Sequence, residues 1–461
     1  MSTKPFYRNQ LRLLGLLCLM ATLSLFSCQD QEIPIEQVVA EKVEAAIPDD
    51  AVVLGRARTP EAAIAEAIDA MEALEAINHT GAKSNRRVGD ITAVRNPEFG
   101  AKGNDLPDTM MYIVNFTDNM GYALVSADYR TSTIYALASE GSIDLSDDAN
   151  EPPALAVFHA NAETFYRQEI EHFHLPLPAD GIKDDDDSPV PPTPKPVITM
   201  QYGPWETTQI ISPLVPVQWG QGSPYNDNAP LLDDGTHAAA GCVATAIAQI
   251  MAYHRYPLSY NWDEMLKYKS IFDNWQASIT SKTEIARLFR TIGDNVGMQW
   301  GSQSGAYTSD APKHFNKMGY ASTGVYMDYD FDKTKISILD GIPIIIRGDA
   351  TQETHTYKKW FLGKTHTEYR YRDGHAWVID GMINRRRKVE VFSDGMLTKS
   401  YYQYEQLLHC NWGWNGTSNG YYNNGAFNTG TGPIIATSVD NYSTVDYHFQ
   451  FNIKSLYNVK P

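Results

Sequence analysis

The pattern of apolar and polar positions predicts a small N-terminal module. Thr59-Pro60-Glu61 is typical of a helix start, because a hydroxyl cap, a proline and an early acid all favour helix initiation. Apolar residues follow on one helical face, at Ile64, Ile68, Met71 and Leu74. Strand-like runs cover 111–116, 121–126 and 132–138, with a turn at 119–121. Pro152-Pro153 then opens a second helix, with Val157, Phe158, Phe165 and Ile170 as apolar positions. Residues 59–175 are therefore predicted to form an α+β module.

Two later segments combine a clear period with reactive side chains. Val243, Ile247, Ile250 and Met251 have helical spacing, and Pro257 ends the pattern. Cys242 stands at the first position of this predicted helix, directly after a glycine. Around His375 the residues alternate, which predicts a strand with His375, Trp377 and Ile379 on one face. A further strand ends at Asn411 and leads into a glycine-rich turn.

The extreme N-terminus has the pattern of an export signal. Lys4, Arg8 and Arg12 precede the apolar run 13–26, which is too short to span a membrane comfortably. Leu25-Phe26-Ser27-Cys28 is similar to a bacterial lipobox, so 1–27 is predicted to be a lipoprotein signal peptide. The same resemblance implies a lipid anchor on Cys28, which would attach the exported precursor to the cell envelope. Residues 28–58 are expected to be an acidic tether, and an ordinary signal peptide is the alternative.

An Asp- and Pro-rich stretch separates the module from the rest of the chain. Four aspartates at 184–187 precede five prolines between 189 and 196, and both features oppose compact packing. Residues 176–204 are therefore predicted to be a linker that contains a maturation site. Calcium binding is a weaker reading, since contiguous aspartates lack the alternating ligands of a calcium loop.

Composition and charge support this division. The 461 residues are 43% hydrophobic and 20% charged, which is globular composition. The net charge is −17, and residues 29–200 carry −19 while residues 201–461 carry −1. Nucleic acid is therefore excluded as a general partner, because phosphate binding needs clustered cations. All nine tryptophans lie beyond residue 200, which favours two units with different roles.

The predicted helix start at Cys242 favours a reactive thiol. Unpaired N–H groups and the helix dipole stabilise a thiolate there, and the thiolate is the nucleophilic form. Cys410 is the other cysteine of this region, so a single disulfide between Cys242 and Cys410 is one alternative. A buried, inert Cys242 is the other. His375 on its strand is the candidate base. His237, in the loop before the helix, and His254, three turns along it, are rivals.

A Cys–His pair of this kind also needs orienting and oxyanion groups. Asn411 can accept a hydrogen bond from one nitrogen of His375, and a neighbouring indole can screen that bond from water. Gln221, between two glycines, can donate a side-chain amide to an oxyanion together with the N–H of Cys242. Gln218 and Gln249 are alternatives. This chemistry requires neither a metal nor a cofactor.

Four motifs in order carry a family resemblance. They are Gln-Gly-Ser-Pro-Tyr-Asn from 221, Gly-Cys-Val-Ala-Thr-Ala from 241, Gly-His-Ala-Trp-Val-Ile-Asp-Gly from 374 and Asn-Trp-Gly-Trp from 411. Together they resemble the streptopain-like cysteine peptidases over about 205–461, and 59–175 more weakly resembles the propeptide or inhibitor-like domain of that group.

The resemblance implies an α+β protein, with a papain-like two-domain cysteine peptidase after a small α+β prodomain. It implies that Cys242, His375, Gln221 and Trp412 are active-site residues, with Asn411 beside them and Trp414 in a supporting role.

The expected function is that of an exported zymogen of a cysteine endopeptidase. Its partners would be protein or peptide substrates, its own prodomain as intramolecular inhibitor, and the membrane through Cys28. Gly301, Ser302 and Gly305 are candidate substrate-groove residues, with a plain surface loop as the alternative. Residues 351–372 look like an insertion, and a hairpin near the cleft is the expected form. The alternatives are a non-catalytic surface lipoprotein that binds peptide or glycan, and a Cys–His amidase or transglutaminase.

Overall fold

The computed structural model describes residues 52–53, 55–78, 86–96, 99, 107–144, 153–173, 196–271, 278–358, 365–427 and 453–461. All of them lie within one compact unit, residues 41–461. The expected signal peptide, the lipidation site Cys28 and most of the tether 28–58 lie outside the described residues. None of the described helices is long and apolar enough to cross a membrane.

The N-terminal module has the predicted helices and the three predicted strands, together with one strand, β2 (Val88–Arg95), that was not predicted from the sequence. Its helices are α1 (Pro60–Asn78) and α2 (Pro153–Glu171), and its predicted strands are β3 (Thr109–Phe116), β4 (Tyr122–Ser126) and β5 (Ile134–Ala138). The strands pair in sequence order as an antiparallel meander. The predicted turn at 119–121 needs Gly121, because a Cβ there would lie 2.1 Å from the carbonyl oxygen of Ala138.

The buried face of α1 differs from the predicted one. Ile68 is 38% exposed, whereas Met71 and Leu74 are buried as expected. Alanines form most of the contact face, at Ala63, Ala67 and Ala70. Small side chains let the helix approach the sheet closely. The prediction counted only the larger apolar residues, so it placed the buried face of α1 part of a turn away from the observed one.

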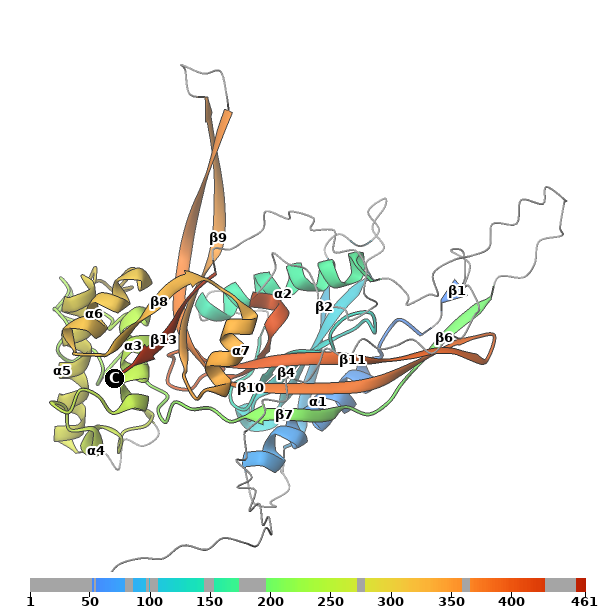
Figure 1. Cartoon of the computed structure of the whole chain (residues 1–461), viewed down its shortest axis with the longest axis horizontal. Coiled ribbons are helices and arrows are strands. Elements are labelled where there is room, and N and C mark those ends of the chain that lie inside the picture. The colour runs from blue at the N-terminus through green and yellow to red at the C-terminus, as the bar shows by residue number, and fades with distance from the viewer. Residues whose placement is uncertain are drawn as a thin grey trace, which may run out of the picture. The chain divides into compact units, whose positions relative to one another are not determined.

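The C-terminal part combines a group of helices with an antiparallel sheet, which confirms the α+β class. The helices are α3 (Cys242–His254), α4 (Trp262–Met265), α5 (Ile279–Val296), α6 (Ala311–Lys317) and α7 (Phe331–Leu339). The strands are β7 (Glu206–Ile211), β8 (Ser322–Asp328), β9 (Ile344–Lys358), β10 (Thr365–Ser393), β11 (Met396–Asn411), β12 (Gly420–Asn423) and β13 (Lys454–Lys460). Figure 1 shows α3 to α6 grouped on one side of the long strands.

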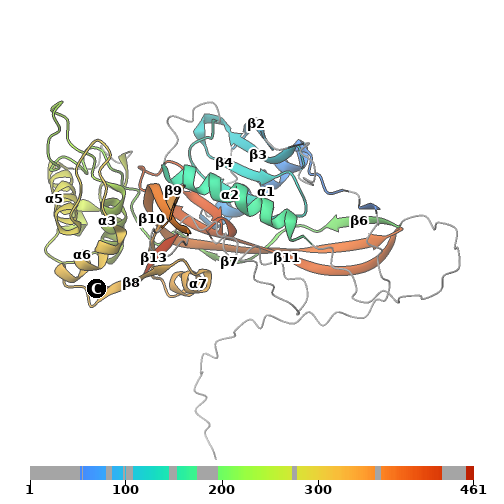
Figure 2. The ribbon, with the colours of Figure 1, turned by 90° about the horizontal axis from the view of Figure 1, so that it is seen from above.

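One sheet runs through both parts of the molecule. Its strand order is β2-β3-β4-β5-β12-β11-β10-β9-β13-β8. The junction is the antiparallel pair β5–β12, in which Ala136, Leu137 and Ala138 face Tyr422, Tyr421 and Gly420. In Figure 2, α2 lies beside β9 and β10. The module is therefore joined to the rest of the chain by backbone pairing as well as by side chains.

The end of the predicted linker is ordered. Most of 176–204 lies outside the described residues, but β6 (Val197–Tyr202) pairs with β10. Two residues within the expected tether pair with β6 in turn, since β1 (Val52–Val53) is parallel to β6. Threonine, valine and isoleucine at 197–199 favour a strand over the coil that the preceding prolines predicted.

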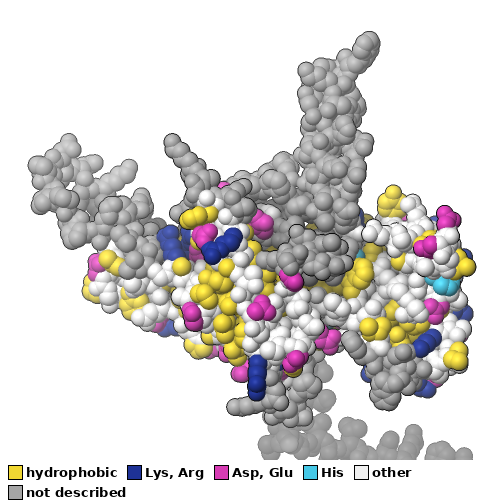
Figure 3. Space-filling model, turned by 180° about the vertical axis from the view of Figure 1, so that it is seen from behind, with side chains coloured by type: hydrophobic (Ala, Val, Ile, Leu, Met, Phe, Trp, Pro, Cys, Tyr) yellow, Lys and Arg dark blue, Asp and Glu magenta, His cyan; other side chains and the backbone are white. Residues whose placement is uncertain are grey.

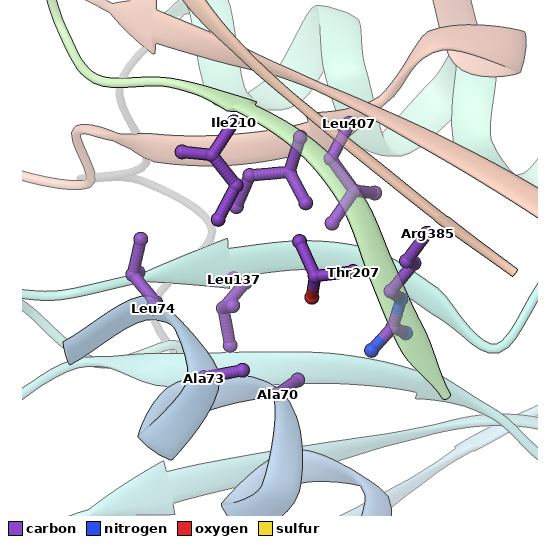
Figure 4. Close-up of a pocket in the computed structure, with 9 residues that line it drawn as sticks. Ala70, Ala73, Leu74, Leu137, Thr207, Ile210, Arg385 and Leu407 are labelled. Carbon is purple, nitrogen blue, oxygen red and sulfur yellow. The ribbon is translucent and has the colours of Figure 1, made fainter. Parts of the chain in front are cut away.

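The module and the sheet also share their hydrophobic cores. Figure 4 shows Leu74, Leu137, Ile210 and Leu407 lining a small gap between α1, β5, β7 and β11. On the other face, Phe158 of α2 packs edge-on against Tyr422, with ring centroids 4.7 Å apart. The outer surface is mixed, because Figure 3 shows acidic and basic side chains scattered among apolar ones on the visible face.

Candidate active site

Cys242 is the first residue of α3, as the sequence predicted. Gly241 precedes it with φ of 87°, a backbone conformation that favours glycine. A Cβ at Gly241 would lie 2.8 Å from Cε of Met298 and 3.2 Å from the carbonyl oxygen of Ser304, so no larger residue fits. The helix behind the cysteine is buried along its length, which fixes the sulfur rigidly.

Cys242 and His375 form a hydrogen-bonded pair. Burial alone would raise the pKa of the Cys242 thiol, but the charge of His375 and its hydrogen bond lower it. The backbone N–H groups of Ala376 and Val243 act in the same direction, and the net pKa of Cys242 lies below its ordinary value. Both cysteines of this region are free, so Cys242 and Cys410 do not form the disulfide that the sequence allowed. The arrangement stabilises a thiolate beside an imidazole.

The backbone of Trp412 orients His375. Its carbonyl oxygen lies 2.9 Å from Nε2 of the histidine. Because a carbonyl can only accept, Nε2 must carry the proton, and Nδ1 is the nitrogen left for the sulfur. His375 is 4% exposed and lies on β10 with Trp377 and Ile379, on the face that the alternation predicted.

The expected orienting role of Asn411 is not what the structure shows. Its Oδ1 accepts from Nε2 of Gln249 at 2.9 Å, and its Nδ2 donates to the carbonyl of Val217 at 2.8 Å. Both ends of the amide are thus engaged away from His375. Asn411 instead ties the strand end to α3 and to the segment before Gln221.

The two tryptophans of the Asn-Trp-Gly-Trp motif have exchanged expected roles. The ring stacked on His375 is that of Trp414, with centroids 5.9 Å apart and planes 18° from parallel. The ring of Trp412 packs against Trp377, at 4.9 Å. Gly413, with φ of 77°, turns the backbone between them. Trp412 therefore contributes its carbonyl to the base, and Trp414 contributes the covering indole.

Gln221 has a free donor. Its Nε2 is buried and has no hydrogen-bond partner among the described residues. Its carbonyl accepts from the N–H of Ala240 at 2.9 Å, which ties the Gln221 loop to the residues just before Cys242. The N–H of Cys242, at the first helical position, has no intrahelical acceptor. Two donors are therefore available for an oxyanion.

The rival residues are engaged elsewhere. Nδ1 of His237 is 2.8 Å from the carbonyl of Ala229, in the predicted loop. His254 lies at the end of α3, about 18 Å along the helix, and burial lowers its pKa to about 4. Gln249 binds Asn411, and Gln218 packs on Gly416.

The candidate groove loop lies next to the nucleophile. Gln299 and Gly305 exchange backbone hydrogen bonds at 2.9 and 3.1 Å, which closes the loop on itself. The carbonyl of Gly301 accepts from the N–H of Ala239 at 2.9 Å, three residues before Cys242. The loop that contains Gly301, Ser302 and Gly305 is thereby fixed beside the start of α3.

The expected insertion is a hairpin. The backbone of β9 and β10 continues as an antiparallel pair from Thr351 and Arg372 out to Lys358 and Thr365.

Cys410 is fully buried, and burial raises the pKa of its thiol. It is therefore an inert core residue, unlike Cys242.

Sequence reasoning missed one supporting residue on α3. The hydroxyl of Thr245 lies 3.1 Å from the carbonyl of Gly241 and 3.3 Å from that of Gly220. It can therefore hold the Gln221 loop against the helix start. The signal was its position one helical turn from Cys242, on an otherwise apolar stretch.

Comparison with known proteins finds similar sequences. Residues 219–259 and 258–422 match the Peptidase C10 family. Streptopain from Streptococcus pyogenes is 26% identical over 372 residues, covering 71% of this chain and 76% of streptopain. Thiol protease/hemagglutinin PrtT from Porphyromonas gingivalis is 26% identical over 377 residues, covering 76% of this chain and 38% of PrtT.

Two solved structures are also similar. A fragment of prointerpain A from Prevotella intermedia has a TM-score of 0.47 and 19% identity, covering 81% of this chain and 99% of that one. Active interpain A from the same organism has a TM-score of 0.33 and 22% identity, covering 54% and 95%.

Proposed function

This chain is a streptopain-like cysteine peptidase, and from that premise we propose that it hydrolyses internal peptide bonds through a Cys242–His375 dyad. The proposal is carried by the contact between the two side chains, in which the charge of His375 and its hydrogen bond hold the pKa of Cys242 below its ordinary value. A thiolate of this kind is both nucleophilic and stable in the resting enzyme.

In the proposed reaction, the Cys242 thiolate attacks the scissile carbonyl carbon. The C–S bond forms while the carbonyl oxygen becomes an oxyanion, which accepts from the Cys242 N–H and from Nε2 of Gln221. The imidazolium of His375 gives its Nδ1 proton to the leaving amine as the C–N bond breaks. Water then attacks the thioester, His375 takes one of its protons, and the acid product leaves with the thiolate restored.

The N-terminal module is proposed to act as an intramolecular inhibitor. Supporting this, it shares a sheet and two hydrophobic cores with the catalytic part. Cleavage in the linker would start activation, and the proposed lipid on Cys28 would hold the exported precursor in the cell envelope until the module is released. Gly301, Ser302 and Gly305 are proposed to line the substrate groove, since their loop is fixed beside Cys242.

The test compares the purified full-length precursor with its Cys242→Ala variant. We expect the wild type, under reducing conditions, to cleave casein into peptides and to cut its own linker, as read by N-terminal sequencing, while the variant does neither. A thiol-directed covalent probe should label Cys242, and the label should be lost in His375→Ala. Cross-linked casein without peptide fragments would instead indicate a transglutaminase.

A further inference from the structure

An ion pair lies directly against the peptide that leads to the catalytic base. Arg347 and Asp349 on β9 form a salt bridge, and they face Ala376 and Gly374 on β10. Opposite residues of an antiparallel pair project to the same face, so both charged side chains lie on the face of residues 374 and 376.

Gly374 leaves room for this ion pair because it has no side chain. A Cβ at Gly374 would lie 2.5 Å from Oδ1 of Asp349 and 2.7 Å from Nη2 of Arg347. The two charged groups therefore occupy the space that a side chain at position 374 would fill, one residue before His375. Gly374 is itself exposed, so this position is open to solvent.

The nucleophile contacts the neighbouring residue pair of these two strands. The N–H of Ala376 hydrogen bonds to the sulfur of Cys242, and Ala376 is the partner of Arg347 across the strands. Such partners have Cα atoms about 5 Å apart. An extended substrate advances about 3.3 Å per residue, so two of its residues span more than this Cα separation.

The two members of the pair differ in access to solvent. The side chain of Asp349 is 3% exposed, whereas that of Arg347 is 22% exposed. Arg347 also has a hydrogen bond with the half-buried Tyr326 of β8. Asp349 and Tyr326 thus fix a guanidinium that still has an accessible edge, and a fixed donor loses little entropy when it binds an acceptor.

We propose that Arg347, positioned by Asp349, is a specificity-determining residue that binds a substrate side chain ending in an oxygen acceptor, a carboxylate or carboxamide, near the scissile bond. The inference rests on the proposed peptidase function. A charge-assisted hydrogen bond to the guanidinium should favour glutamine or glutamate over an apolar residue of the same size by about tenfold in kcat/KM.

The experiment uses fluorogenic peptides that differ only by glutamine or methionine, at each of three positions on either side of the cleaved bond. The activated full-length protein is compared with Arg347→Met and with Arg347→Met/Asp349→Asn, which leaves no buried unpaired charge. Arg287→Met, at an exposed arginine on α5, is the matched control.

We expect one position at which the wild type and the control prefer glutamine about tenfold, and at which both Arg347 variants lose the preference while still cleaving the methionine peptide. An unchanged glutamine preference, or an equal loss on both peptides, would overturn the inference. Absence of cleavage of any peptide by the wild type would instead contradict the peptidase proposal, with Cys242→Ala as the blank.

Discussion

The catalytic centre and the interface with the N-terminal module both bury polar groups, but the pairing of these groups differs between the two regions. At the centre, Nε2 of Gln221 and Nε1 of Trp414 are buried without a partner among the described residues. At the interface, the carboxylate of Glu405 accepts from the N–H of Thr133 at 2.5 Å and of Ile134 at 3.0 Å, and from Nε of Arg385 at 2.6 Å. An unpaired buried donor lowers stability, so it is expected where a ligand supplies the missing acceptor.

The interface is also closed by stacked cations and rings. Arg387 pairs with Glu66 of α1 at 3.0 Å and lies over the rings of Tyr202 and Trp205, at 4.5 and 4.7 Å. Tyr202 stacks in turn on Tyr129 of the module, at 4.5 Å. Arg385 and Arg387 each have an ion-pair partner here, although Nη2 of Arg387 and Nε1 of Trp205 are buried without a hydrogen bond among the described residues. The interface therefore differs from the centre in that its buried charges are paired within the chain.

The largest effect should come from removing the base. We expect His375→Ala to lower kcat/KM by about 10⁴-fold or more. The variant has no imidazole to stabilise the thiolate or to protonate the leaving amine. The pKa of Cys242 should rise in this variant, since burial remains while the lowering charge is gone.

Alkylation by iodoacetamide at a series of pH values measures that pKa. The wild-type thiol should stay reactive as the pH falls below the usual thiol range and lose reactivity only below its lowered pKa. In His375→Ala, reactivity should need alkaline pH. Identical profiles for the two proteins would contradict the ion pair.

At the interface, the largest effect should be on stability. Glu405→Ala leaves Arg385 and two backbone N–H groups buried without their acceptor, so the free energy of unfolding of the precursor should fall by about 3–5 kcal/mol. Urea denaturation measures this difference.

The matched control for Glu405 lies on the neighbouring strand. Glu390 pairs with the exposed Lys388 at 2.6 Å, and Glu390→Ala should change the free energy of unfolding by no more than about 1 kcal/mol. If the two variants were equally stable, the contrast between buried and exposed pairs would not hold here.

Replacing Gln221 should affect activity and leave stability nearly unchanged, which is the opposite of the effect expected for Glu405. Gln221→Ala should lower kcat by about 10²–10³-fold, because one oxyanion donor is lost. Its stability should be close to that of the wild type, since Nε2 has no hydrogen bond to lose. Steady-state kinetics and a urea titration on the same preparation test both halves, and a destabilised Gln221→Ala with normal kcat would reverse the assignment.

The sequence predicted local features better than long-range ones. The helix start at Cys242 and the strand at His375 follow from short-range periodicity and flanking glycines, and both are confirmed. The partners of Asn411 are not predictable this way, because Val217 and Gln249 come from segments far along the chain. Likewise, a buried strand such as β12 does not reveal that its partner is β5, since its side-chain pattern fits many neighbours.

The smallest expected effect concerns the ring over the base. Which of two tryptophans stacks on His375 depends on the turn at Gly413, and the structure assigns the role to Trp414. A stacked aromatic contact contributes about 0.5–1.5 kcal/mol, so Trp414→Leu should lower kcat/KM by about two- to tenfold. Trp412→Leu should mainly lower stability, because its fully buried ring packs on Trp377 and Tyr422 while its carbonyl remains in place. Kinetics and unfolding of the two variants side by side separate the roles, and a larger kinetic loss in a stable Trp412→Leu would return the covering role to that residue.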